Sequence, residues 1–357
     1  MKRILWVLLG LFLLLVAYLA LWPVAVDPAV WAPPTAPAMT GDYAANSRLG
    51  AMTRVDLDDG HGPEDVAVDD VGRIYGGLQD GRIMRYQPTS SAWETFVHTG
   101  GRPLGLHFDV DGNLIVADAF KGLLSIDAAA KITVLSTEVG GLPFAFTDDL
   151  DIGPDGTVYF SDASFKFNQA NWMADAIEHR PNGRLLAYYP ASKTTEVLLA
   201  DLHFANGVAV SADGDFVLVN ETWEYRVTRY WLTGEKKGSS EPFIENLPGF
   251  PDGISSNGKG IYWLALPTVR NPVIDKMADK PFLRKVVTRL PHWMQPTNAR
   301  YAFILGLNTE GEVVYNLQEP NGNPFAMITS IQEHDGTLYL GSLHESAFAF
   351  LPAPEKP

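Results

Sequence analysis

A short pattern that recurs six times constrains this chain more than any other feature of its sequence. Each copy has a short alternating strand, a turn rich in Asp, Asn and Gly, and a second apolar strand, which together predict a β-hairpin. The copies begin at or near Glu64, Arg102, Phe146, Phe204, Phe250 and Met327. Further short strands lie between them, so each unit holds roughly four strands in about 40–50 residues. We therefore expect an all-β fold, a six-bladed β-propeller whose blades bury their faces against their neighbours.

The N-terminus has a different character. Residues 4–22 form an uninterrupted apolar run of 19 residues, preceded by Lys2 and Arg3. This run is long enough to cross a bilayer as a helix and longer than the apolar region of most cleaved signal peptides. We predict a retained, single-pass signal anchor. A cleaved signal is the alternative, although Ala20 and Ala25 offer only poor cleavage sites.

The charge beside this run predicts its orientation. The positive residues before the run predict that residues 1–3 stay in the cytoplasm as a short stub. The chain after the run would then lie on the extracytoplasmic side, periplasmic or luminal. Residues 23–48 are rich in Pro and Ala and predict an extended linker that holds the following domain away from the membrane. Residues 49–357 would then be the propeller, which we expect to be the catalytic domain.

One insertion interrupts the spacing between the fifth and sixth copies. Residues 271–302 contain helix-like runs and are basic in an otherwise acidic chain. We interpret them as a helical insertion between blades. The segment would be a lid over the active face, or it would lie on anionic lipid as an interfacial helix.

Composition excludes several classes of function. The formal net charge of −15 argues against nucleic acid as a partner, since contacts to its backbone need Lys and Arg. The chain has no Cys, which excludes disulfides, thiolate metal sites and cysteine nucleophiles. Serine hydrolases, zincins and P-loop NTPases have motifs that do not occur in this sequence.

The repeat also aligns polar residues. Because the first strand of each blade runs along the central channel, the residue that opens each copy should face one end of that channel. In blade order these positions hold Glu64, Leu104, Asp148, Asn206, Asp252 and Thr329. Three carboxylates and one amide, from four different blades, are therefore expected to converge.

Such a group of carboxylates must either bind a cation or take up protons, because like charges at short range raise one another's pKa strongly. All-oxygen ligation without Cys or clustered His favours a hard ion, and carboxylates with an amide carbonyl favour Ca²⁺ over Mg²⁺. We predict a Ca²⁺ with about seven ligands, two or three of them open positions. The alternative for each acidic residue alone is a turn cap.

Several motifs place the chain in a known family. Residues 204–266, with RPLGLHFD, FTDDLDI and IQEHDGTLYLGSL elsewhere, closely resemble the strictosidine synthase-like proteins. These include adipocyte plasma membrane-associated protein and belong to a superfamily with paraoxonases, gluconolactonases and regucalcin. The resemblance implies Ca²⁺ in the central channel of a six-bladed propeller. Its ligands would be Glu64, Asp148, Asn206 and Asp252.

The same resemblance implies a second, structural Ca²⁺ held by Asp65 and Asp149, for which turn caps are the alternative. It also argues against one activity. The plant enzymes that make strictosidine use a Glu just before their version of IQEHDG, where this chain has Thr329 and Ser330. We therefore do not expect a true strictosidine synthase.

The leading hypothesis is a Ca²⁺-dependent hydrolase of small esters or lactones, similar to arylesterases and lactonases, with promiscuous phosphotriesterase activity. The catalytic residues would be Glu64, Asp252, Asn206 and His203. Water or a carboxylate such as Asp252 would attack the polarised carbonyl, and His203 or His107 would carry protons. Apolar walls would come from Leu104, Phe144, Phe165, Trp223, Phe250 and Trp263, unless these only pack blades.

Two rival functions remain at this stage. A non-catalytic, membrane-tethered propeller would bind Ca²⁺ only to present a surface for a ligand or a protein, because the fold alone does not decide function. Oxidation or dehydration of a sugar lactone has less support, since the sequence carries no cofactor motif.

Overall fold

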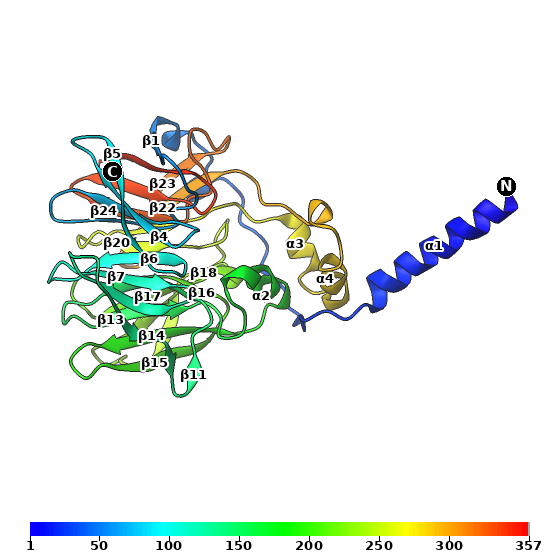
Figure 1. The fold of residues 1–357 in the computed structure, drawn as a ribbon, viewed down its shortest axis with the longest axis horizontal. Helices are drawn as coiled ribbons and strands as arrows, with labels where there is room; N and C mark the ends of the chain where they lie inside the picture. Colours follow the sequence, from blue (N-terminus) through cyan, green and yellow to red (C-terminus); the bar gives the residue numbers. More distant parts are fainter. Residues whose placement is uncertain (356–357) are drawn as a thin grey trace.

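The computed structural model describes residues 1–355, and these form a six-bladed β-propeller with one long helix outside it (Figure 1). Each blade is a four-stranded antiparallel sheet, which confirms the architecture predicted from the repeat. Blade 1 holds β2 (Val66–Val68), β3 (Ile74–Gly77), β4 (Arg82–Gln87) and β5 (Ala92–His98). Blade 2 holds β6 (Pro103–Phe108), β7 (Leu114–Asp118), β8 (Gly122–Ile126) and β9 (Ile132–Ser136). Blade 3 holds β12 (Thr147–Ile152), β13 (Val158–Asp162), β14 (Gly183–Tyr189) and β15 (Thr194–Leu202).

The remaining blades follow in chain order. Blade 4 holds β16 (Ala205–Val210), β17 (Phe216–Glu221), β18 (Arg226–Trp231) and β19 (Ser240–Ile244). Blade 5 holds β20 (Ile254–Ser256), β21 (Tyr262–Ala265), β22 (Ala302–Leu307) and β23 (Val313–Glu319). Blade 6 holds β24 (Ser330–His334), β25 (Thr337–Gly341), β26 (Ala347–Pro352) and β1 (Thr53–Asp56). A small hairpin, β10 (Glu138–Val139) with β11 (Leu142–Pro143), lies between blades 2 and 3.

The two ends of the propeller chain meet in blade 6. β1 pairs antiparallel with β26, with Thr53 opposite Phe350, so the N-terminal segment supplies the outer strand of the last blade. This closure joins the start and end of the ring without a covalent bond. The hairpin repeat did not predict it, because a hairpin signal needs two strands that are adjacent in sequence.

Apolar side chains fill the spaces between neighbouring blades. Trp263 and Tyr315 of blade 5 belong to one buried cluster with Leu338 and Leu340 of blade 6. Burying a side chain of this size stabilises the fold by about 1.5–3 kcal/mol. A blade therefore depends on both of its neighbours, as expected for a repeat that buries its faces by stacking.

Close approach of the inner strands forms the channel. β2, β6, β12, β16, β20 and β24 contact one another in a closed ring. At Gly207 and Gly253 a side chain would collide with backbone of the next blade, at the carbonyl oxygens of Asp252 and Thr329 respectively. Only glycine, which has no Cβ, allows the inner strands of neighbouring blades to lie this close together.

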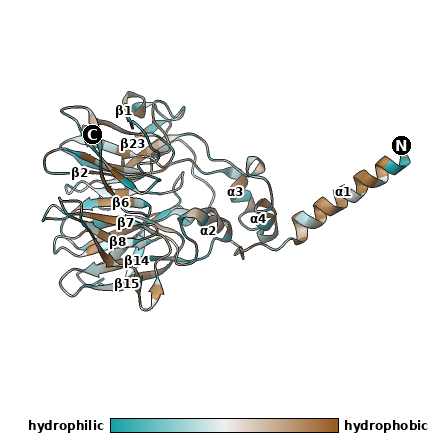
Figure 2. Cartoon of the chain, viewed as in Figure 1, coloured by the Kyte–Doolittle hydropathy of each residue, from teal (hydrophilic) through white to brown (hydrophobic). Residues whose placement is uncertain are grey.

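The N-terminal helix α1 (Lys2–Leu21) is apolar beyond its hydrophilic first turn, and none of its residues is buried by the propeller (Figure 2). Its 20 residues make it long and apolar enough to cross a membrane. It extends away from the side of the propeller that carries α2 (Trp172–Glu178), α3 (Pro272–Met277) and α4 (Pro281–Val287) (Figure 1). The predicted run, residues 4–22, matches this helix closely.

The insertion is helical, as expected, but its position differs from the prediction. α3, α4 and the 3-10 helix η5 (His292–Met294) lie between β21 and β22, inside blade 5 rather than between two blades. β22 pairs with β21 across the insertion, which the sequence did not reveal because 36 residues separate the two strands, from Ala265 to Ala302. Arg289 donates to the carbonyl oxygens of Leu19 and Trp22, so the insertion caps the C-terminal end of α1.

The segment between α1 and the propeller is extended, but it is not a free spacer. Val26 is buried, the Trp31 amide donates to the Ala278 carbonyl, and Arg270 donates to the Pro34 carbonyl at 2.8 Å. The segment therefore packs on the propeller, and its role in separating the domain from a membrane stays a prediction. Its carbonyl oxygens find donors on the propeller, and its apolar side chains find partners there. Short 3-10 helices end it: η1 (Gly41–Tyr43) and η2 (Arg48–Ala51).

Candidate functional site in the central channel

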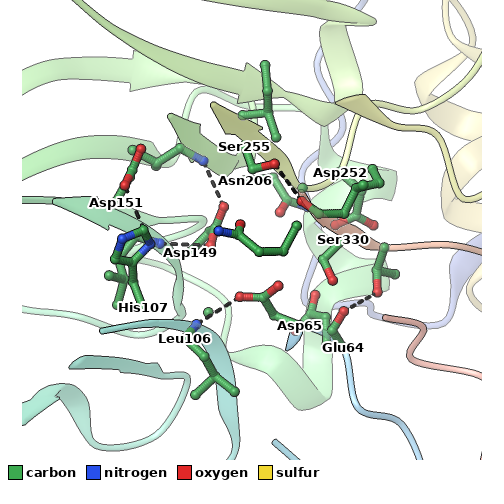
Figure 3. Close-up of a pocket in the computed structure, with 18 of the residues that line it drawn as sticks. Glu64, Asp65, Leu106, His107, Asp149, Asp151, Asn206, Asp252, Ser255 and Ser330 are labelled. Carbon is green, nitrogen blue, oxygen red and sulfur yellow. Dashed lines mark hydrogen bonds and ion pairs between the residues drawn. The ribbon is translucent and has the colours of Figure 1, made fainter. Parts of the chain in front are cut away.

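The four predicted oxygen donors all line one narrow channel along the propeller axis. We call them the channel ring: Glu64, Asp148, Asn206 and Asp252. Each lies at or just before the start of an inner strand, in blades 1, 3, 4 and 5 respectively. Figure 3 shows Glu64, Asn206 and Asp252 around a common space. The repeat alignment therefore placed these residues correctly.

A repeated backbone irregularity directs these side chains. The pairing of the first and second strands shifts register between Thr147 and Leu150 in blade 3, and between Ala205 and Val208 in blade 4. Such β-bulges re-aim side chains and occur beside active sites. The same shift occurs in blade 2, between Pro103 and Leu106. There, however, the ring position holds Leu104.

The electrostatics of the ring favour a cation. Burial and the nearby Asp252 carboxylate raise the pKa of Glu64 to about 8. Burial raises the pKa of Asp252 to about 7, and burial together with Glu64 raises the pKa of Asp148 well above its usual value. Crowding and burial therefore disfavour full ionisation of the ring, and a bound cation would offset this cost.

One atom of the channel ring indicates most clearly that the ring suits a metal ion. Oε2 of Glu64 is buried and has no hydrogen-bond partner among the described residues. Leaving a buried carboxylate oxygen unpaired is costly, so a ligand is expected there. A carboxylate and amide donor set suits a hard ion such as Ca²⁺.

Asp65 and Asp149, the candidates for a second ion, already have partners. Oδ1 of Asp65 accepts from the Val66 amide and Oδ2 accepts from the Leu106 amide of the next blade, at 2.8 and 2.9 Å. Asp149 bonds in the same way to the amides of Leu150 and Val208, each at 2.8 Å. These bonds tie blade 1 to blade 2 and blade 3 to blade 4. They account for both carboxylates without a metal, so the second Ca²⁺ stays a prediction.

The other end of the channel has its own polar pair. Nδ1 of His107 lies 3.5 Å from Oδ1 of Asp151, and both residues line the channel. Asp151 also accepts from the amides of Ile152 and Val210. His107 is thus engaged away from the channel ring, as its position on the strand suggested.

Sequence reasoning missed a cation beside the ring. Arg102 is 2% exposed and donates to the carbonyls of Gly77 and Gly62, each at 3.0 Å. Its charge lowers the pKa of Glu64 and of Asp148, partly opposing their burial. The sequence offered one indication of this cation, namely that Arg102 is a basic residue at the start of the second hairpin copy.

His203 is not part of the channel lining. Phe204 has a φ of 62°, a left-handed conformation that is uncommon for a residue of this size. This turn separates His203 from Asn206 and leaves it facing Glu221 and Glu224. His203 therefore lies outside the channel lining, and its catalytic role stays a prediction.

The predicted apolar walls divide into two groups. Leu104 and Trp223 share a cluster with Phe146 and Phe204, residues that lie beside ring positions, and Phe250 contacts Trp223. Phe165 is the most exposed of the predicted six, at 36%. By contrast, Phe144 packs with residues of blades 2 and 3, and Trp263 packs between blades 5 and 6. These last two belong to blade packing.

Thr329, the ring position of blade 6, has a structural partner. Its hydroxyl donates to the Glu64 carbonyl at 2.7 Å and joins the last blade to the first. Ser330 follows it, and its hydroxyl is buried without a partner among the described residues. These two positions hold hydroxyl groups and no carboxylate base.

The fold and this site define a class: six-bladed propellers with an oxygen-lined acidic channel. The chain belongs to the strictosidine synthase-like family, which includes adipocyte plasma membrane-associated protein. It is 33% identical over 342 residues to that protein of Rattus norvegicus, covering 89% of this chain and 90% of the relative. It is 36% identical over 317 residues to strictosidine synthase-like protein 10 of Arabidopsis thaliana, covering 81% and 84%.

Two family models agree with this assignment, and solved structures agree with the fold. The model "Strictosidine synthase-like, N-terminal" matches residues 41–86 and the model "Strictosidine synthase" matches residues 148–235. A gluconolactonase from Xanthomonas campestris superposes with a TM-score of 0.63 at 16% identity, over 93% of this chain and 99% of that one. The calcium-binding protein regucalcin from Agrobacterium tumefaciens gives 0.60 at 15% identity, over 85% and 96%. At these identities the likeness shows the fold.

Proposed function

We propose that the channel ring binds Ca²⁺ and that the protein is a Ca²⁺-dependent hydrolase of small esters or lactones. The observation that carries this proposal is the convergence of three carboxylates and an amide from four blades, with Oε2 of Glu64 buried and unpaired. Two structural neighbours support it by their names, a gluconolactonase and a calcium-binding regucalcin. Promiscuous phosphotriester hydrolysis would use the same polarising charge.

A bound calcium ion would polarise the substrate carbonyl and stabilise the negative charge that develops on its oxygen, an effect typically worth several kcal/mol. Glu64, Asp148 and Asp252 would hold the ion through carboxylate oxygens, and Asn206 through its amide oxygen. The Asn206 Nδ2 donates to the Thr222 hydroxyl at 3.3 Å, which leaves its oxygen free to face the channel. Water or the Asp252 carboxylate would attack the carbonyl carbon.

The small size of the channel supports a substrate site outside it. The channel encloses about 40 Å³, enough for an ion or a few water molecules, whereas small-molecule pockets usually measure about 300–1,000 Å³. The substrate would therefore bind above the ring, against Trp223 and Trp172. Their rings stack with centroids 6.2 Å apart, and Trp172 is 37% exposed.

We further propose that α1 spans the membrane once and that the propeller lies on the extracytoplasmic side. The positive residues Lys2 and Arg3 before the apolar helix support this orientation. α1 leaves the propeller on the side of α2, α3 and α4, so this side would face the bilayer (Figure 1).

A non-catalytic Ca²⁺-binding propeller is the second candidate. The small volume of the channel favours it, because an ion that is closed off from substrate would serve only to hold the blades together. In that case Ca²⁺ would stabilise the protein, and no ester or lactone would be turned over.

Hydrolysis assays separate the two candidates. The full-length protein in detergent would be tested on phenyl acetate, p-nitrophenyl esters and a series of lactones, first with Ca²⁺ and then with a chelator. We expect turnover that needs Ca²⁺ and is lost in Glu64→Gln, while Asp335→Asn, at an exposed carboxylate, is unaffected. Ca²⁺ binding without turnover of any substrate would reject the hydrolase and leave the binding propeller.

A further inference from the structure

A second group of ligand-type side chains lies outside the channel. His179, His203 and Glu224, which we call the histidine cluster, each offer one ligand atom, and these atoms all lie within 4.8 Å of one another. His179 follows α2, His203 precedes β16, and Glu224 ends the 3-10 helix η4 (Thr222–Glu224). Three separate loops therefore bring the cluster together, and none of its residues lines the channel.

The spacing of the cluster suits a small, tetrahedrally coordinated ion. Nε2 of His179 lies 3.2 Å from Oε1 of Glu224, and Nδ1 of His203 lies 3.6 Å from the same oxygen. Ligands about 2.0–2.2 Å from a zinc ion in a tetrahedral site are separated from one another by about 3.4 Å. The two measured separations bracket that value.

One atom of the cluster also lacks a partner. Nδ1 of His203 is buried and has no hydrogen-bond partner among the described residues. The nearest carboxylate oxygens, Oε1 of Glu224 and Oε2 of Glu221, lie 3.6 and 3.9 Å from this nitrogen. A buried nitrogen that faces a carboxylate without bonding to it is a position that a metal ion would satisfy.

We propose that the histidine cluster is a binding site for a divalent transition-metal ion, with Zn²⁺ as the expected occupant. Two imidazole nitrogens and one carboxylate oxygen suit zinc and are unlike the all-oxygen donor set of the channel. The side chains of His203 and Glu224 are 22% and 18% exposed, so a fourth position is open to water. The protein would thus hold two chemically distinct metal sites.

Neighbouring residues hold two of the three ligand residues in place. The ring of Trp31 stacks on His179 with centroids 4.1 Å apart and fixes its plane. The His203 amide donates to Oε2 of Glu221 at 3.1 Å, and Glu221 is in turn held by Arg226 and Thr228. Such outer contacts set ligand orientation and affect metal affinity about 10–100-fold.

A metal at this position would have a structural consequence. Trp31 belongs to the segment that joins α1 to the propeller, and the Ala29 amide of that segment donates to the Glu178 carbonyl beside His179. An ion in the histidine cluster would fix the end of α2 against blade 4. It would thereby stabilise the surface on which the N-terminal segment packs.

The test uses the full-length protein in detergent, with Ca²⁺ present to occupy the channel. Zn²⁺ would be titrated by calorimetry against a competing chelator, and Co²⁺ would be added as a spectroscopic probe. We expect one Zn²⁺ per chain, a higher thermal midpoint with Zn²⁺, and the visible absorption of tetrahedral Co²⁺. Absence of both Zn²⁺ binding and the Co²⁺ bands from the wild type would overturn the proposal.

Variants assign the binding to these residues. His203→Gln and Glu224→Gln should each weaken Zn²⁺ binding at least about 100-fold, whereas His334→Gln, a histidine elsewhere on the surface, should change nothing. Equal loss in all three variants, or loss in none, would mean adventitious surface binding and would contradict the proposal. If a variant does not fold, the wild-type Co²⁺ spectrum still decides whether the protein binds an ion in tetrahedral coordination. None of these readouts depends on hydrolysis.

Discussion

The channel ring and the histidine cluster both gather metal-ligand side chains, but they take them from different kinds of position. The ring residues occupy equivalent places in four blades, and the fold brings equivalent places together on its axis. The cluster residues come from a helix end, a turn before a strand and a 3-10 helix, which have no common place in the repeat. A repeat therefore makes a site on its axis predictable, whereas a site built by loops depends on how each loop folds.

The largest expected effect comes from the ring. Glu64→Gln should lower the rate of Ca²⁺-dependent hydrolysis at least about 100-fold, since it removes a ligand charge from the polarising ion. The metal-free variant should be as stable as the wild type or more stable, because one of several crowded carboxylates is neutral. Stopped assays and thermal unfolding measure the two quantities. Lower activity together with lower metal-free stability would point to misfolding instead.

The pH dependence of stability tests the same charges without a substrate. Burial raises the pKa values of Glu64 to about 8 and of Asp252 to about 7 in the folded state, above those of the unfolded chain. These two groups should therefore contribute most to the free energy of unfolding of the metal-free protein below about pH 4.5. Their contribution should be lost as the pH rises through 7 and 8.

Calcium should reverse this loss, so the difference in thermal midpoint between Ca²⁺ and chelator should widen from pH 5 to pH 8. The midpoints with and without Ca²⁺ would be measured at each pH. A constant difference would contradict the placement of the buried carboxylates around one cation.

Asp65 lies next to Glu64 in sequence but is expected to behave differently. Both of its carboxylate oxygens accept backbone amides, so Asp65→Asn would turn an amide NH₂ toward an N–H donor. We expect a loss of about 1–3 kcal/mol in the free energy of unfolding, with or without Ca²⁺. Denaturant unfolding measures it. If the loss is seen only with Ca²⁺ present, Asp65 ligates a second ion after all.

A smaller effect is expected from the N-terminal segment. Trp31→Ala removes a half-buried ring that stacks on His179 and contacts Tyr225, and it should cost about 1–2 kcal/mol in stability. It should also weaken Zn²⁺ binding by about tenfold and leave hydrolysis unchanged. Unfolding curves and Zn²⁺ titrations check these values. Altered hydrolysis would mean that the segment reaches the channel site.

The smallest effect is expected at the far end of the channel. His107 pairs with Asp151 and lies away from the ring, so His107→Gln should leave Ca²⁺ affinity and hydrolysis close to the wild-type values. Kinetic assays across pH check this. A large loss of rate would restore His107 as the proton carrier that the sequence suggested.

Particular residues show how far the sequence could go. Glu64, Asp148, Asn206 and Asp252 were found because the hairpin period fixes where each inner strand starts, and the fold converts that period into a circle. The position of His203 outside the channel lining could not be predicted in this way, because it follows from a left-handed turn at Phe204 that no periodic pattern signals.

Contacts between segments far apart in the chain also could not be predicted from the sequence. β1 completes blade 6 through partners almost 300 residues away, and the Pro-rich segment binds the propeller through carbonyl groups that every residue possesses. Neither contact can be predicted from the local composition of the sequence. The apolar helix α1, in contrast, is a local feature, and its predicted bounds were nearly correct.

The most direct test of the channel ring is a calorimetric titration of the full-length protein with Ca²⁺ at pH 7, repeated in buffers with different ionisation enthalpies. If the buried carboxylates surround one cation site, Ca²⁺ binds and releases protons into the buffer, and both signals disappear in the Glu64→Gln, Asp252→Asn double variant. Wild-type protein that binds no Ca²⁺, or a double variant that binds it equally well, would contradict the account.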